Sequence, residues 1–136
     1  MAGEKILIID DDPDIVEAMR VVLESKNYQI VIAKNGEEGL KKVKSENPKL
    51  IILDVMMETA DKGFEVAREI RKNKLYKNIP IIVLTAIQEK MGLDFKNESG
   101  DDTWLPVDDY VEKPVKAEEL ISKVQTLLAR KSAEGR

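Results

Sequence analysis

The chain has 136 residues, 43% of them hydrophobic and 35% charged, with a formal net charge of −4, which fits one domain with a substantial core. The acidic balance disfavours direct nucleic-acid binding and electrostatic attachment to membranes, and no apolar run is long enough for membrane insertion. With no cysteine, no histidine and no secretory leader evident, disulfides, thiolate metal sites and imidazole catalysis are excluded, and we expect a cytoplasmic protein.

Strands and helices are expected to alternate in the first half of the chain. The expected elements are strands over Glu4–Asp10, Tyr28–Ala33 and Leu50–Leu53, and helices over Pro13–Lys26 and Glu37–Glu46. The strands are runs of β-favouring residues, whereas the helices carry apolar residues at helical spacing. Asp12 is a favourable N-cap before Pro13, so the beginning of the first helix is well marked.

The second half continues this alternation. A polar loop is expected over Glu58–Lys62, then a helix over Gly63–Asn73, strands over Ile79–Leu84 and Asp109–Val111, and a helix over Lys116–Lys131. These boundaries assign residues 4–131 to one domain and leave residues 132–136 as a frayed C-terminal tail. Alternating strands and helices predict an α/β fold in which helices cover both faces of a parallel sheet.

Polar residues stand where four of the predicted strands end. They are Asp10 with Asp11, Asp54, Thr85, and Lys113 shortly after the last strand. Because the carboxyl ends of parallel strands share one edge, where such sheets bind ligands, we expect these side chains to converge. If the first and third strands are neighbours, Asp10, Asp11 and Asp54 share one crevice.

Three carboxylates in one crevice would repel one another. A hard divalent cation such as Mg²⁺ removes that repulsion, because it prefers carboxylate, water and phosphate oxygens. A plainer interpretation is that Asp10 and Asp11 complement the dipole of the following helix and that Asp54 only ends a strand. Asp12 already serves as the cap, so we favour the metal interpretation for Asp10 and Asp11.

Thr85 and Lys113 add a hydroxyl and an amine to the same edge. Taken singly, Thr85 is an ordinary strand residue, Lys113 a solvated surface amine and Tyr110 a half-buried core ring. Together, Thr85 and Lys113 supply a hydrogen-bond donor and a positive charge suited to a phosphoryl group on Asp54. Because the chain contains no histidine, it cannot form a phosphohistidine itself, so a phosphoryl group has to arrive from outside this chain.

The motifs ILIIDDDP, LIILDVMM, IIVLTA and DYVEKP follow one another at the predicted strand ends. In this order they resemble the receiver domain of bacterial two-component response regulators (CheY-like domains), over Lys5 to about Arg130. The resemblance implies a flavodoxin-like, doubly wound five-stranded parallel sheet of order 2-1-3-4-5 flanked by five helices. It also implies a phosphoprotein that acts in signal transduction, as part of a phosphorelay.

The resemblance assigns Asp54 as the nucleophile that accepts phosphoryl from a sensor histidine kinase or a histidine phosphotransfer protein. The implied Mg²⁺ ligands are Asp11 directly, Asp10 mainly through water, Asp54, and the backbone carbonyl of Met56. The bound metal would neutralise charge on the transferring group while the Asp54 carboxylate attacks in line.

The remaining implied roles concern binding and switching. Lys113 would pair with one phosphoryl oxygen and Thr85 would hydrogen-bond another. The Lys113–Pro114 peptide bond is expected to be cis, which fixes the approach of the lysine. Tyr110 resembles the aromatic switch that turns inward when the threonine moves, so that phosphorylation shifts the population between two surfaces.

Two departures from the family pattern carry expectations of their own. The segment Gln88–Pro106 shows little helical period, so we expect an irregular or shortened fourth helix there. Residues 58–62 also reshape the loop after Asp54. Met56 and Ile87, which would flank the phosphoryl group, cannot orient an attacking water by hydrogen bonding. We therefore expect slow self-dephosphorylation.

The favoured function is a phosphorylation-controlled signalling module without an attached output domain, working through a downstream protein partner. It is not a conventional enzyme, because it catalyses only its own phosphorylation and dephosphorylation.

A degenerate receiver that acts as a phosphorylation-independent binding module is an alternative, although such chains usually lose Asp54, the acidic pair or Lys113. A small Mg²⁺-dependent aspartate phosphatase is disfavoured because Met56 replaces the second acid of such enzymes. A nucleotide or flavin domain lacks its glycine-rich loop here.

Overall fold

The computed structural model describes residues 3–54, 60–85 and 107–134. Its elements are β1 (Lys5–Ile9), α1 (Pro13–Glu24), β2 (Gln29–Ala33), α2 (Gly36–Glu46), β3 (Leu50–Asp54), α3 (Ala60–Lys72), β4 (Ile81–Thr85), β5 (Asp109–Glu112) and α6 (Ala117–Glu134). The strands are parallel and form one sheet of order β2-β1-β3-β4-β5. The predicted α/β fold and strand order are therefore confirmed.

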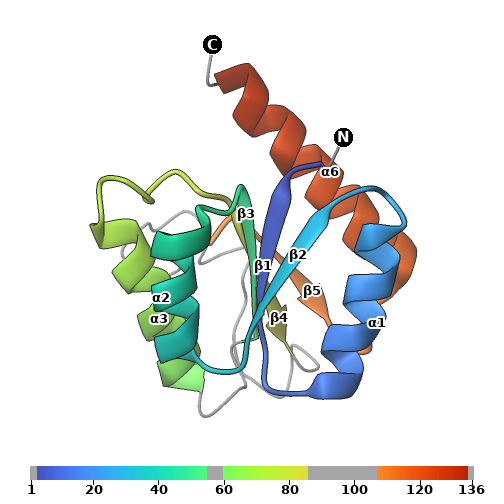
Figure 1. Cartoon of the computed structure of the whole chain (residues 1–136), viewed down its shortest axis with the longest axis horizontal. Coiled ribbons are helices and arrows are strands. Elements are labelled where there is room, and N and C mark those ends of the chain that lie inside the picture. Colours follow the sequence, from blue (N-terminus) through green and yellow to red (C-terminus); the bar gives the residue numbers. More distant parts are fainter. Residues whose placement is uncertain (1–2, 55–59, 86–106, 135–136) are drawn as a thin grey trace.

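Helices cover both faces of the sheet, with α1 and α6 on one face and α2 and α3 on the other (Figure 1). The central strands are buried on both sides, which explains why they are continuous apolar runs without alternation. In β1, Ile6 and Ile8 pack in the cluster under α1 and α6, whereas Leu7 and Ile9 pack in the cluster under α2 and α3. The two cores hold β1 and β3 side by side, with Ile9 opposite Leu53.

Most predicted boundaries shift by one or two residues, and two of them shift by three. Helix α3 begins at Ala60, so the last three residues of the predicted loop Glu58–Lys62 are helical. Helix α6 continues to Glu134, so the predicted tail is helical over residues 132–134. Both boundaries were predicted from the limits of the apolar pattern, but a terminal turn beyond the core requires only good helix formers such as alanine, lysine and glutamate.

Some expectations fall outside the described residues. The irregular fourth helix predicted for Gln88–Pro106 lies there, as do Met56 and Ile87, on which the slow dephosphorylation was predicted.

A tight contact between α2 and β1 gives a test of the packing on the α2 side. A Cβ added at Gly39 would lie 2.5 Å from Cδ1 and 2.9 Å from Cγ1 of Ile9, which is fully buried. We expect Gly39→Ala to lower the free energy of unfolding, because overpacking costs about 1 to 3 kcal/mol, more than the helix propensity gained, at most about 1 kcal/mol. Denaturant unfolding measures the change. Ser45→Ala, at an exposed site of the same helix, is the control; an equal or higher stability of Gly39→Ala would contradict the packing argument.

A guanidinium ties the end of α3 to the beginning of β5. Arg71 donates hydrogen bonds to the carbonyl oxygens of Lys77 (2.9 Å) and Ile79 (2.6 Å) and to Oδ2 of Asp108 (2.6 Å). The same carboxylate oxygen accepts the backbone N–H of Ile81 at 2.8 Å. One Arg–Asp pair thus fixes the loop before β4 and the entry to β5 relative to each other.

Candidate functional site

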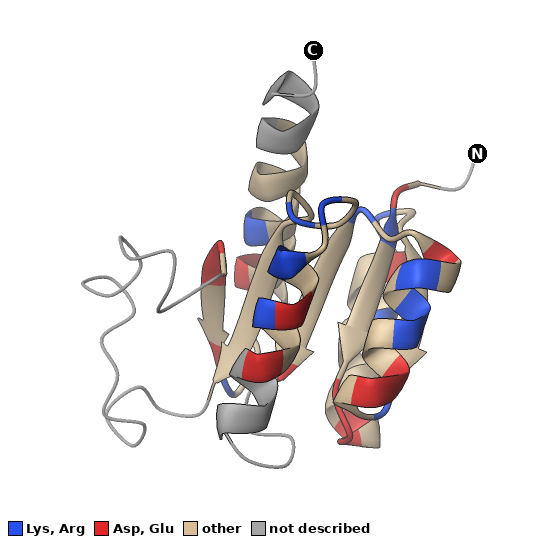
Figure 2. Ribbon diagram, turned by 90° about the vertical axis from the view of Figure 1, so that its left-hand side faces the viewer, with Lys and Arg blue, Asp and Glu red and all other residues tan. Residues whose placement is uncertain are grey.

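The carboxyl edge of the sheet brings together three carboxylates. Asp10 directly follows β1 and Asp54 ends β3, and these strands are neighbours, as predicted. Each of Asp10, Asp11 and Asp54 can offer one oxygen such that all three lie within 4.8 Å of one another. Asp10 and Asp54 are 1% and 2% exposed, whereas Asp11 is open to solvent. Figure 2 shows acidic residues at this end of the sheet, toward which the strand arrows point.

Asp10 lies in surroundings that disfavour its negative charge. Its Oδ1 accepts the backbone N–H of Asp12 at 2.9 Å, but its Oδ2 is buried without a hydrogen-bond partner. Burial, together with the negative charge of Asp54, raises the pKa of Asp10 to about 6, although the Asp12 hydrogen bond and Lys113 oppose the rise. A buried carboxylate oxygen without a hydrogen-bond donor is costly, so this position favours a cation or a proton.

Lys113 supplies the positive charge of the site. Its Nζ lies 3.1 Å from Oδ2 of Asp54 and 4.0 Å from Oδ2 of Asp10. Its backbone N–H donates to the carbonyl oxygen of Thr85 at 2.7 Å, which attaches the lysine to the end of β4. The Lys113–Pro114 peptide bond is cis, in agreement with the expectation from sequence.

Thr85 lies on β4, the strand beside that of Asp54, and Tyr110 lies on β5, the next strand beyond β4. Thr85 is fully buried at the end of β4, and Tyr110 is half-buried in β5 opposite Val83. The Tyr110 ring packs against the core cluster under α2 and α3. The structure therefore brings Thr85 to the same edge as Asp54, and places Tyr110 on the adjacent strand.

The residues present fit a hard divalent cation. Carboxylate oxygens of Asp10, Asp11 and Asp54 converge at one place. Oδ2 of Asp10 has no hydrogen-bond partner, and a bound cation would supply the missing interaction. The alternative role, capping α1, belongs to Asp12, whose carboxylate accepts N–H groups from Asp14 and Ile15. The backbone carbonyl of Met56 lies outside the described residues.

The contact of Lys123 with Tyr110, the predicted switch residue, was not predicted from the sequence. Lys123 of α6 places its Nζ 4.9 Å from the centre of the Tyr110 ring, 3.2 Å from Oδ1 of Asp109, and within hydrogen-bond distance of the Tyr110 carbonyl oxygen. The available signal was a lysine directly before the buried Val124, but solvated lysines occur at such positions routinely.

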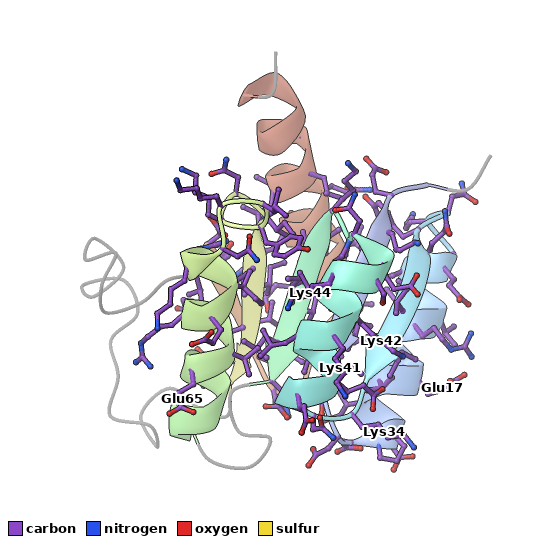
Figure 3. The ribbon with its side chains drawn as sticks, turned by 60° about the vertical axis from the view of Figure 1, so that its left-hand side comes forward. Glu17, Lys34, Lys41, Lys42, Lys44 and Glu65 are labelled. Atoms are coloured by element: carbon purple, nitrogen blue, oxygen red, sulfur yellow. The ribbon has the colours of Figure 1, made fainter. Side chains whose placement is uncertain are left out.

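The lysines of α2 do not form a separate site. Figure 3 shows Lys41, Lys42 and Lys44 on this helix. Two of these lysines pair with glutamates one turn earlier, Lys41 with Glu37 at 3.7 Å and Lys42 with Glu38 at 3.5 Å. Much of the positive charge on this helix is therefore compensated locally. Within the described parts of the chain, no helix combines the length and apolar character needed to cross a membrane.

Comparison with known proteins identifies the family. The profile of the response regulator receiver domain matches residues 6–125. The chain is 39% identical to the alkaline phosphatase synthesis transcriptional regulatory protein PhoP of Bacillus subtilis, covering 94% of this chain and 50% of that protein. It is 41% identical to the transcriptional regulatory protein ResD of the same organism, covering 94% of this chain and 49% of that protein.

A solved structure shows the same fold. The CheY-like response regulator receiver domain protein from Methanospirillum hungatei superposes with a TM-score of 0.79 at 27% identity, covering 98% of this chain and 99% of that one. The chain spans about half the length of the curated relatives it matches. From these matches, the chain belongs to the receiver domain family of two-component response regulators.

Proposed function

We propose that this domain accepts a phosphoryl group on Asp54 from the phosphohistidine of a sensor histidine kinase or a histidine phosphotransfer protein. The observation that carries the proposal is the buried Asp54 carboxylate, 3.1 Å from the Lys113 ammonium and grouped with Asp10 and Asp11. Family membership makes the same chemistry the first expectation.

In the proposed reaction, a carboxylate oxygen of Asp54 attacks phosphorus. The P–O bond to Asp54 forms while the P–N bond to the donor imidazole breaks, and the imidazole leaves with the bonding electron pair. Lys113 already contacts Asp54, so its charge is placed to stabilise a phosphoryl oxygen, and the Thr85 hydroxyl is assigned to another. Asp10, Asp11 and Asp54 would hold Mg²⁺, which neutralises charge on the transferring group.

The phosphorylated state is proposed to act by a population shift. Movement of Thr85 toward the phosphoryl group would open space into which Tyr110 turns, and the surface around β5 would change. The extent of the shift is limited by how differently the two states bind the phosphoryl group. Phosphorylation and hydrolysis of the aspartyl phosphate would be the only reactions that this domain catalyses.

The partners are proposed from the relatives and from the fold. PhoP and ResD are named as transcriptional regulatory proteins, so regulation of transcription through a downstream partner or an attached domain is a fitting output. We assign the receiver to residues 4–131, with α6 continuing past this boundary to Glu134, and we propose a cytoplasmic location, where histidine kinases present their phosphohistidine.

Acetyl phosphate provides the direct test. Incubation with acetyl phosphate and Mg²⁺ should add one phosphoryl group, seen by intact-protein mass spectrometry, and chelation of Mg²⁺ should remove the labelling. Asp54→Asn should take no label, whereas Asp14→Asn, an exposed charge-matched control on α1, should be labelled like the unmodified protein. Absence of label in a folded protein that binds Mg²⁺ would instead favour the phosphorylation-independent binding module.

A further inference from the structure

Lys123 makes three contacts with two consecutive residues of β5. Its ammonium lies 4.9 Å from the centre of the Tyr110 ring, 3.2 Å from Oδ1 of Asp109, and against the carbonyl oxygen of Tyr110. Oδ1 of Asp109 also accepts the Tyr110 N–H at 2.8 Å. The lysine side chain is 26% exposed, so its charge is partly withdrawn from solvent. A cation fixed over an aromatic face in this way is attracted by the ring.

The three contacts differ in what a rotation of Tyr110 would do to them. Turning the ring about its Cα–Cβ bond leaves the backbone carbonyl and the Asp109 carboxylate in place. Only the ammonium–ring contact depends on the side-chain rotamer. Because Asp109 and the carbonyl oxygen anchor the ammonium independently of the ring, Lys123 cannot simply follow the ring without losing those two bonds. The contact therefore favours the ring orientation described here over others.

We infer that Lys123 is a positioning residue for the Tyr110 switch, a cationic latch that holds the ring in its present rotamer. The inference rests on the proposed function, because it concerns the regulation of the same site. Any reorientation of Tyr110 on phosphorylation has to give up the ammonium–ring contact. Lys123 thus adds to the free-energy cost of switching, although α6, which carries it, does not contact the reacting atoms.

The competing explanation is that Lys123 has only a structural role. In that case its pairing with Asp109 stabilises the packing of α6 on β5, and the ring contact is incidental. The two explanations differ in which substitutions change the Tyr110 rotamer. A latch depends on a cation at position 123, whereas a purely structural pair depends equally on the carboxylate of Asp109.

The test measures the χ1 rotamer populations of Tyr110 by NMR, from three-bond couplings between the aromatic Cγ and the backbone N and C′ in isotopically labelled full chain. No phosphoryl donor is present in this experiment. The variants are Lys123→Met, which keeps the length of the side chain without its charge, Lys123→Arg, which keeps the cation, and Asp109→Asn. Lys116→Met, at an exposed lysine just before α6, is the charge-matched control.

A latch predicts that Lys123→Met raises the ratio of other Tyr110 rotamers to the present one by about two- to fivefold, the equivalent of one partly exposed cation–π contact. Lys123→Arg and Lys116→Met should leave the ratio near its original value, and Asp109→Asn should change it less than Lys123→Met. An unchanged ratio in Lys123→Met, or an equal change in Asp109→Asn, would overturn the inference. If Lys123→Met does not fold, Lys123→Gln replaces it.

This outcome can be separated from the proposed function. The rotamer measurement is made on unphosphorylated protein, so it remains readable if Asp54 fails to accept phosphoryl from acetyl phosphate. Conversely, normal labelling of Asp54 with unchanged rotamers in Lys123→Met would sustain the proposed function and reject the latch.

Discussion

Replacing Asp10 with asparagine should raise the free energy of unfolding of the Mg²⁺-free protein at pH 7.5 by up to about 3 kcal/mol. The reason is that the pKa of Asp10 is raised from 3.8 to about 6 in the folded protein, chiefly by burial. At 1.36 kcal/mol per pKa unit, holding this group ionised in the fold costs about that much. Asparagine is nearly isosteric, and its amide oxygen can still accept the Asp12 N–H. The cost of charge burial is removed while the turn is kept.

The gain should depend on pH in a defined direction. Between about pH 4 and pH 6 the folded protein holds a proton on Asp10 that the unfolded chain has lost. The contribution of Asp10 to stability is therefore present below pH 4 and is lost as the pH rises to about 6. The asparagine variant has no such loss, so its advantage should be small at pH 4 and complete above pH 6.

Urea unfolding in the presence of a chelator, at pH values from 4 to 8, measures this difference. Asp14→Asn removes a charge two residues after Asp12 at an exposed position and should show no comparable gain. A stability difference between Asp10→Asn and the unmodified protein that stays constant over this range would refute the burial argument. A lower stability of the variant at pH 7.5 would refute it as well.

Replacing Asp11 with asparagine should weaken Mg²⁺ binding by at least about tenfold. Even residues that only hydrogen-bond to a metal's ligands typically cost about that much affinity when they are replaced. Asp11 is the solvent-open member of the three-carboxylate group. Mg²⁺ is reluctant to give up its waters and binds proteins through one or two carboxylates. Loss of the accessible carboxylate should therefore reduce affinity without the packing disturbance expected at a buried position.

Isothermal titration with MgCl₂ measures the affinity directly. The matched control is Asp12→Asn, which removes the neighbouring charge but keeps a good N-cap for α1, since asparagine also accepts N–H groups there. Equal losses in Asp11→Asn and Asp12→Asn would show that only the local negative potential matters, and that Asp11 is not a ligand.

The fold was readable from the sequence because the central strands β1, β3 and β4 are apolar runs, each ended or followed by a polar residue. Ile51–Leu53 and Ile81–Leu84 have to be buried on both faces, and only a sheet covered on both sides does that. Convergence of the site was predicted on the condition that the first and third strands are neighbours, an order that the family resemblance supplied, and the structure pairs them so that Asp10 follows β1 beside Asp54 at the end of β3. The helix ends were less predictable, because residues such as Ala60 and Glu134 lie beyond the apolar pattern that marks a helix.

The electrostatic details of the site could not be predicted. Nothing in the sequence tells which oxygen of Asp10 finds a hydrogen-bond donor, and its raised pKa depends on its burial, on the Asp12 hydrogen bond and on the nearby charges of Asp54 and Lys113. The Lys123–Tyr110 contact is likewise a product of packing, because it requires α6 to lie along β5 at a particular rotation. Such contacts join residues through space at distances that composition and periodicity do not encode.

The Arg71–Asp108 pair has a consequence for how this domain can diverge. β4 ends at Thr85 and β5 begins at Asp109, and both strands are held in register, with Ile82 opposite Asp109. The Arg71 bonds and the Asp108–Ile81 bonds secure the entry to β5 independently of residues 86–106. Closing a longer connection between fixed ends costs little, about 0.6 kcal/mol per doubling of its length. Length changes in residues 88–106 can therefore accumulate at modest cost to the stability of the sheet.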